Sequence, residues 1–410
     1  MIISLFCQLL KRGNMTTLSN DPQFSSSLRT ALSGIGSRLD QMEIDNKSLF
    51  SGSGGIALFY AYLYQLSEED DHLQKVHAIV RRQLDPSSGT FKTASYANGT
   101  IGLAWLLAHF SKMGLLALED ERRFFSALSD KIVRHSKDLF RERNTDILHG
   151  AMGAALFFRE NDRYAFSRRH LAIMVSEITR SATEEGDLVY WETGIYPDFG
   201  QSDKLSKRNL GFAHGTPGIL KILLDCSCYR EVDAGVCERM IRKGLAYVLS
   251  FRSRRRSVSL FPYCATDDLQ EGIYNTRLAW CYGDLTIALL LFHAGRKYND
   301  PDYLRQAKEI AWHCLGRRHQ PDTGIEDPYL CHGSSGVAHL YQLLYDETGE
   351  AKFREEALYW FGETIRYCNL MEDLVHPGFL EGIAGAGLSI IAALDSSCSG
   401  WNRALFLSIG

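Results

Sequence analysis

Two kinds of segment alternate along this chain. In one kind the residues are apolar nearly all round, as at residues 56–66, 103–110, 219–224 and 287–292. Such segments predict helices that are buried on all sides. In the other kind the apolar residues recur at spacings of three and four, which predicts amphipathic helices with one buried face.

Residues 300–315 illustrate the amphipathic kind. Asp300 can cap the start of a helix, and Pro301 suits the first helical position. The apolar residues that follow share one face of that helix: Leu304, Ala307, Ile310, Ala311, Cys314 and Leu315. The same spacing recurs one unit later at Leu358, Phe361 and Ile365. We therefore expect amphipathic and fully apolar helices to alternate.

A Gly-x-x-Gly step precedes each fully apolar segment. The seven steps begin at Gly52, Gly99, Gly150, Gly215, Gly283, Gly333 and Gly382. Their spacings are 47, 51, 65, 68, 50 and 49 residues, and only the fifth departs, with Thr286 in place of the second glycine. Glycine at such a position permits close approach of the backbone. One repeat is thus an outer amphipathic helix, a glycine turn and an inner buried helix.

The repeat predicts a closed fold. A unit of this size cannot bury its apolar face alone, so neighbouring units must stack. An open solenoid would leave the inner helices in water, whereas a closed ring buries them. We predict an all-α protein, an α/α toroid or barrel of seven helical hairpins with inner and outer helix rings, as a single domain over residues 21–410. Residues 1–20 are expected to be an N-terminal extension, either a non-native start or a flexible segment.

Composition narrows the class of protein. The 410 residues are 45% hydrophobic and 23% charged with a net charge of -4, which is the usual globular balance. There is no basic surplus to suggest nucleic acid, and no apolar run approaches the ~20 residues of a transmembrane segment. No export signal is recognised, so we expect a cytoplasmic protein. Its ten cysteines would then serve metal binding or catalysis rather than disulfides.

Chemistry-bearing residues stand directly before the glycine steps. If every inner helix starts at the same end of the ring, these residues converge on one mouth. Cys281, Cys331 and His332 offer two thiolates and an imidazole, a donor set that suits zinc. Three protein ligands leave a fourth position open, as in catalytic sites, where a bound thiol would stay deprotonated. The alternative is that both cysteines are ordinary small buried residues.

Four further residues are candidates at the same mouth. His214 shares the repeat position of His332 and could be an acid or base, or a hydrogen-bonded core histidine. His149 has the same position and could be a bystander. Asp146 could cap a helix or orient a histidine. Arg277 could be a rim charge, or it could pair with Asp146 or stabilise an oxyanion.

Three motifs carry a resemblance to a known family: Trp280-Cys-Tyr-Gly283, Cys331-His-Gly333 and Ala213-His-Gly215. The chain resembles the lanthionine synthetase C-like family, the cyclases of class I lanthipeptide biosynthesis, through all seven steps. The resemblance implies an α/α toroid with zinc at its mouth. It assigns Cys281, Cys331 and His332 as the zinc ligands, and His214, Asp146 and Arg277 as catalytic residues.

The resemblance also implies an activity and partners. The expected reaction is addition of peptide cysteine thiols to dehydroalanine or dehydrobutyrine, which closes lanthionine or methyllanthionine rings. The substrate would be a dehydrated precursor peptide. A lanthipeptide dehydratase and an exporter are possible partners in a complex that would hold the protein at the membrane periphery.

Other functions stay open at this point. A related enzyme could add glutathione or another small thiol to dehydroamino acids in proteins, and a non-catalytic protein could use zinc in a peptide-binding scaffold. An unrelated glycosidase-like or prenyltransferase-like α/α barrel fits the candidate residues less well. Two departures from the family pattern stand out: Asp284, Leu285 and Thr286 replace smaller residues, and the material between repeats is short for an accessory domain that would bind the leader peptide.

Overall fold

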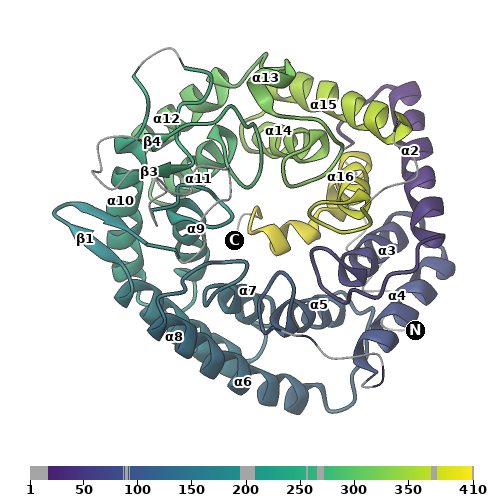
Figure 1. Ribbon diagram of the computed structural model, residues 1–410, viewed down its shortest axis with the longest axis horizontal. Coiled ribbons are helices and arrows are strands. Elements are labelled where there is room, and N and C mark those ends of the chain that lie inside the picture. The colour runs from purple at the N-terminus through teal and green to yellow at the C-terminus, as the bar shows by residue number, and fades with distance from the viewer. Residues whose placement is uncertain are drawn as a thin grey trace.

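A computed structural model describes residues 17–408 except 86, 88–90, 92, 194–207, 255–256, 266–271 and 371–375. The expected N-terminal extension therefore lies mostly outside the described residues. Within the described part the chain forms two concentric rings of helices (Figure 1). This arrangement confirms the predicted α/α toroid.

Seven inner and seven outer helices alternate along the described chain. The inner helices are α3 (Ser53–Ser67), α5 (Thr100–Lys112), α7 (Gly153–Glu160), α9 (Thr216–Cys226), α11 (Asp284–Lys297), α14 (Ser334–Thr348) and α16 (Ile383–Leu394). The outer helices are α2 (Pro22–Asp40), α4 (Asp70–Leu84), α6 (Glu121–Arg141), α8 (Ala165–Arg180), α10 (Ala234–Ser250), α12 (Pro301–His313) and α15 (Ala351–Leu370). Helix α16 packs on α3, and α15 packs on α2, so both rings close.

The two patterns of apolar residues explain the two rings. Every residue of α9 and of α16 is buried, as expected for helices surrounded by others. Helix α12 buries one face, and the Asp300 carboxylate caps its first turn as predicted. The prediction for α15 was off by about one residue: Phe361 is buried, but Leu358 and Ile365 only flank a face centred on Ala357 and Trp360. The aromatic side chains of Phe353, Trp360 and Phe361 occupy the buried face of α15.

The glycine steps mark the starts of the inner helices. The first glycine is the residue before the helix in six of the seven repeats, and in the third the helix begins only at Gly153. At the second glycine a Cβ atom would overlap the carbonyl oxygen of the residue six positions earlier, as at Gly218 over Phe212 and at Gly336 over Leu330. The preceding loop thus folds back directly onto the helix start, which requires the absence of a side chain.

Backbone hydrogen bonds join these loops into a chain around one mouth of the ring. Six of the seven neighbouring pairs of loops are linked: Phe50 N to Ala97 O, Ala97 N to Leu148 O, Phe212 N to Cys281 O, Trp280 N to Cys331 O, Cys331 N to Leu380 O and Leu380 N to Phe50 O. Among the described residues the loops before α7 and α9 share no such backbone bond. That junction is joined instead by side chains described below.

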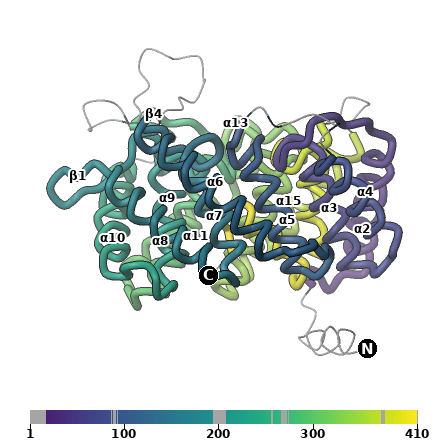
Figure 2. Tube along the Cα trace, turned by 90° about the horizontal axis from the view of Figure 1, so that it is seen from below, coloured from purple at the N-terminus to yellow at the C-terminus, as the bar shows by residue number. Residues whose placement is uncertain are grey.

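The remaining elements lie at the rim and the centre. The two long repeats carry the antiparallel pairs β1 (Thr183–Glu185) with β2 (Leu188–Tyr190), and β3 (Cys264–Ala265) with β4 (Gly272–Ile273). Figure 2 shows β1 projecting from the edge of the ring. A short helix, α13 (Gln320–Thr323), precedes α14. In the described chain no helix combines the length and apolarity that a membrane span needs.

The C-terminal segment fills the centre of the ring (Figure 1). It consists of η3 (Ser396–Cys398) and η4 (Gly400–Leu405) and the residues that follow. The Trp280 indole N–H donates to the Leu405 carbonyl, and the Phe406 ring stacks on Phe212 with centroids 4.8 Å apart. This segment forms a floor beneath the loops of the mouth.

Candidate active site at the mouth of the ring

The mouth contains a cavity of about 180 Å³. It is lined by the two residues that precede the glycine step in most repeats, so the repeat itself builds the cavity wall. Polar groups come from Ser51, Asn98, His149, His214 and Glu381, and the thiols come from Cys281 and Cys331. A larger hollow of about 570 Å³ lies between the ends of α6 and α8, and it contains none of the predicted site residues.

Cys281, Cys331 and His332 form a compact cluster. Their ligand atoms all lie within 4.8 Å of one another, although the two loops that carry them are about 50 residues apart in sequence. Both thiols are free and buried. The hydrogen bond from Trp280 N to Cys331 O, 3.0 Å long, fixes the two loops side by side. The predicted convergence is therefore observed in the structure.

A hydrogen bond couples the two thiols and shifts their pKa values in opposite directions. The pKa of Cys281 lies well below the ordinary thiol value because Cys331 donates a hydrogen bond to it, with a further contribution from His332. The pKa of Cys331 is raised in turn by holding that proton, and burial raises it further. The hydrogen bond to Cys281 also raises the pKa of His332.

The donor set fits a metal ion. Two cysteine sulfurs and an imidazole within one small cluster are the donors that Zn²⁺ prefers, and both sulfurs would be deprotonated on binding. In addition, Nδ1 of His332 is buried without a hydrogen-bond partner in the described part of the chain. A buried ring nitrogen without a partner is costly unless a ligand satisfies it.

Asp146 and His214 form a buried pair beside this cluster. Nδ1 of His214 donates to Oδ2 of Asp146 at 2.7 Å. The other carboxylate oxygen accepts from the backbone N–H groups of Leu148 and His149, at 2.8 and 2.7 Å, so Asp146 is fixed by the start of its own repeat. This pair is the link between the loops before α7 and α9. Because Nδ1 is used, Nε2 of His214 is the nitrogen left for proton transfer.

The Asp146 carboxylate sets the charge state of His214. Burial alone would lower the pKa of His214, but the hydrogen bond and the negative charges of Asp146 and Cys281 raise it above the ordinary value. His149 stacks on His214 with the rings 6.2 Å apart and 12° from parallel. Burial lowers the pKa of His149, so the stacked pair favours one charged ring and one neutral ring.

Arg277 acts on the thiol cluster. Its charge lowers the pKa values of Cys281, Cys331 and His332. The ion pair between Arg277 and Asp146 stays a prediction; the Asp146 carboxylate accepts hydrogen bonds from His214 and from two backbone amides.

Some site residues escaped the sequence analysis. Ser51, Asn98 and Glu381 line the cavity at the position occupied by His149 and His214 in other repeats. The signal that could have found them is the residue before the first glycine of every step, read in all seven repeats. Tyr282 has this position too; burial raises its pKa, and its hydroxyl accepts a hydrogen bond from Asn209 at 2.9 Å.

Comparisons with known proteins cover nearly the whole chain. Residues 43–406 match the family model of lanthionine synthetase C-like proteins. The nisin biosynthesis protein NisC of Lactococcus lactis subsp. lactis is 22% identical over 403 residues, which cover 90% of each chain. The solved structure of a nisin cyclase superposes with a TM-score of 0.73 at 18% identity, over 94% of this chain and 98% of that chain.

Proposed function

The chain belongs to the lanthionine synthetase C-like family, and from that premise we propose that it is a lanthipeptide cyclase that uses zinc. The substrate is a dehydrated precursor peptide. A cysteine thiol of that peptide adds to dehydroalanine or dehydrobutyrine in the same chain and closes a thioether ring. The observation that carries the proposal is that both thiols of the metal cluster and the imidazole of the Asp146–His214 pair line one cavity.

Cys281, Cys331 and His332 would hold the metal ion. When bound, zinc supplies an open position where a peptide thiol is held as a thiolate. The cavity beside it, of about 180 Å³, would admit a short stretch of the peptide. Helix N-termini surround this mouth and favour the negative charge that develops during addition.

His214 would deliver the proton that the reaction needs. The new bond joins sulfur to the β-carbon, the double bond opens, and the electron pair becomes an enolate that must be protonated at the α-carbon. Protonated His214 is suited to this task because its raised pKa keeps the proton available near neutral pH. Asp146 would orient the ring and stabilise its charged form. The peptide thiol gives up one proton and the α-carbon gains one, so the product is an isomer of the substrate.

Arg277 would balance charge around the cluster. The thiolates of Cys281 and Cys331 and that of the substrate would bring negative charge to this site, and the neighbouring guanidinium would offset part of it. Its action on the pKa values of both cysteines supports this placement. The same positive charge is available to the enolate oxygen as the negative charge moves from sulfur to the substrate.

A single peptide distinguishes the proposal from its alternatives. The probe is a synthetic peptide with one dehydroalanine and one cysteine four residues later, incubated with the zinc-loaded protein and glutathione. Ring closure consumes the free thiol without a change in mass. A gain in mass of one glutathione would instead identify a small-thiol transferase, and an unchanged peptide together with tight binding would identify a scaffold.

The remaining expectations stay proposals. Residues 21–410 would form the catalytic domain as one unit. A dehydratase that prepares the precursor and an exporter that removes the product are the expected partners, because the substrate must be dehydrated before cyclisation. Co-purification of the protein with a dehydratase would test this association.

A further inference from the structure

The fifth repeat carries Cys281, and its loop is built differently from the others. Elsewhere the second glycine lets the loop lie directly on the helix start, but Thr286 occupies that position here. Gly283 also differs: its φ is 141°, in the region that favours glycine, whereas the corresponding glycines before α3, α5, α9 and α14 have φ between -133° and -103°. Something other than the glycine contact must hold this loop in place.

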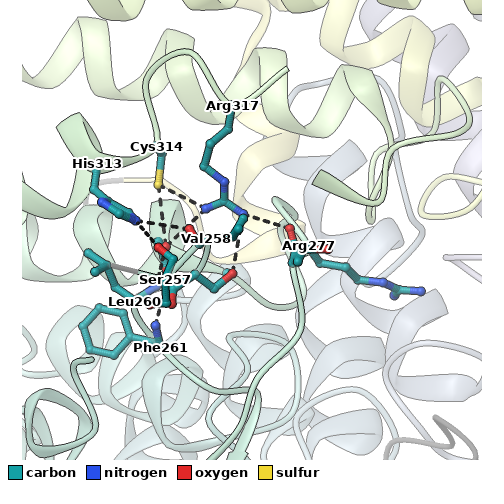
Figure 3. A network of polar contacts seen from close by, with 12 residues as sticks. Ser257, Val258, Leu260, Phe261, Arg277, His313, Cys314 and Arg317 are labelled. Atoms are coloured by element: carbon teal, nitrogen blue, oxygen red, sulfur yellow. Dashed lines mark hydrogen bonds and ion pairs between the residues drawn. The ribbon is translucent and has the colours of Figure 1, made fainter. Parts of the chain in front are cut away.

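A buried ion pair replaces that contact. Asp284, the first residue of α11, is fully buried, and its carboxylate accepts from the backbone N–H groups of Leu260 and Phe261 at 3.0 and 3.1 Å. The same carboxylate contacts Nη1 of Arg317 at 3.3 Å. The Arg317 side chain is 9% exposed. Figure 3 shows this network with Arg317 at its centre and the Arg277 side chain extending away from it.

The Arg317 guanidinium contacts both ends of the loop. Nη1 contacts Asp284, and Nη2 donates to the Thr276 carbonyl at 2.8 Å, so residues 276–284 are held at their two ends by one rigid group. Nε and Nη2 also donate to the Asp322 carbonyl, at 3.2 and 2.9 Å. The residue after Asp322 also binds the loop, since the Thr323 carbonyl accepts a hydrogen bond from the backbone N–H of Leu278 at 2.9 Å.

We propose that Arg317 and Asp284 are positioning residues that fix the loop of residues 276–284, and through it the place of Cys281 in the metal cluster. The inference deepens the proposed function and rests on it only for the identity of the metal. A planar guanidinium suits this role because its N–H groups point in fixed directions toward three acceptors. A lysine would keep the charge but could not reach Thr276, Asp284 and Asp322 together.

The ring offers a matched control at its other end. Arg159 contacts Asp225 at 2.7 Å, and the two side chains are only 6% and 3% exposed. It also donates to the Ser408 hydroxyl at 3.1 Å, and it lies at the end of α7 that points away from the mouth. Arg317→Lys and Arg159→Lys therefore disturb buried pairs of similar exposure, one beside the cluster and one remote from it.

The experiment compares these variants by two readouts that need no enzyme activity. The first is zinc affinity, measured by competition with a chromogenic chelator. The second is cross-linking of Cys281 to Cys331 by dibromobimane in metal-free protein, located by mass spectrometry. We expect Arg317→Lys to weaken zinc binding about tenfold and to slow cross-linking several-fold. Arg159→Lys should change neither, although both variants lower the melting temperature.

The other possible results also test the positioning role of Arg317 and Asp284. Wild-type zinc affinity and cross-linking in Arg317→Lys, or equal losses in both variants, would overturn the proposal. If Arg317→Lys does not fold, Asp284→Asn serves in its place, because the amide oxygen still accepts from the backbone while the charge is lost. If the wild-type protein binds no zinc, the proposed metal fails, yet the cross-linking comparison still tests the positioning role.

Discussion

The inner helices bury titratable groups at both ends. At the C-terminal ends these groups pair with one another, whereas at the mouth some of them line a cavity. At the C-terminal ends, Arg159 and Lys221 both contact Asp225, and Lys221 also donates to the Ser408 carbonyl at 2.7 Å. Each of these three charged groups therefore has an oppositely charged partner, and they surround the C-terminal segment that fills the ring. At the mouth, Cys281 and His214 face a cavity.

This difference separates structural charge burial from a candidate active site. Glu160 at the far end accepts from His109 at 3.0 Å and pairs with Arg403 at 2.5 Å, which balances its charge inside the protein. At the mouth, the cluster includes the buried Nδ1 of His332, for which the described residues provide no partner. Perturbed pKa values occur at both ends, and His293 at the far end also has a buried ring nitrogen without a partner among the described residues. The cavity beside the thiols is therefore the more informative sign.

Removing a thiol at each end is expected to give the largest contrast. Cys281→Ala should abolish ring closure and weaken zinc binding by about a hundredfold or more, because it removes one of three protein ligands. Cys226→Ala, which truncates a buried thiol at the far end, should retain zinc and activity. Metal content by mass spectrometry and thiol consumption measure the contrast. Full metal content in Cys281→Ala would refute the ligand assignment.

Histidines at the two ends offer the next contrast. His214→Ala should lower kcat by about 10²–10⁴-fold, the usual contribution of a general acid, while zinc binding is retained. His109→Ala should instead cost stability, by about 1–3 kcal/mol, because Glu160 loses a buried hydrogen-bond partner. Turnover and urea unfolding are the two measurements. Unchanged thioether formation in His214→Ala would remove that residue from the mechanism.

The Asp146 carboxylate is expected to affect the pH dependence of both kcat and stability, because it raises the pKa of His214. The pKa of His214 is raised above its ordinary 6.5, so the protonated acid and the stability it brings are fully present below that value and are lost as pH rises through the folded-state pKa. Asp146→Asn keeps the backbone contacts but removes the charge. Its alkaline limb of kcat should move to lower pH, and kcat should fall about tenfold to hundredfold at neutral pH.

The pH-rate profile and the pH dependence of unfolding both check this expectation. A limb that stays in place in Asp146→Asn would show that another group supplies the proton. Asp225→Asn, at the far end of the ring, is the control and should leave the limb unchanged.

Arg277 should give the smallest effect. Arg277→Lys keeps a positive charge near the thiols and should lower kcat no more than about tenfold, whereas Arg277→Met should lower it further and raise the pKa of Cys281. Alkylation rates of Cys281 in metal-free protein, measured against pH, follow that pKa. Identical rates in wild type and Arg277→Met would show that this charge does not reach the cluster.

The sequence predicted the fold well because one physical requirement repeats. Each glycine step permits the same close contact between a loop and the start of a helix. The spacing of the steps alone therefore predicted the hairpins, their order and the convergence of Cys281 and Cys331. The interpretation of Thr286 as a mild departure was incomplete. It marks the repeat where Asp284 and Arg317 replace the glycine contact, and this pairing joins residues 33 positions apart with no shared pattern.

Other features had no periodic signal. The C-terminal segment follows the last repeat, so nothing in its sequence predicted that it would fill the centre of the ring. The Asp146–His214 pair was one alternative among several, since a capping aspartate and a catalytic one look alike in sequence. Here Asp146 does both, because it binds two backbone amides with one oxygen and the imidazole with the other.

X-ray absorption at the zinc edge of the purified protein tests the central claim most directly. The account predicts about one zinc per chain, with two sulfurs at ~2.3 Å and at least one nitrogen at ~2.0 Å, and a third sulfur when a cysteine-containing peptide is added. A protein without zinc, or a zinc shell without sulfur, would contradict it.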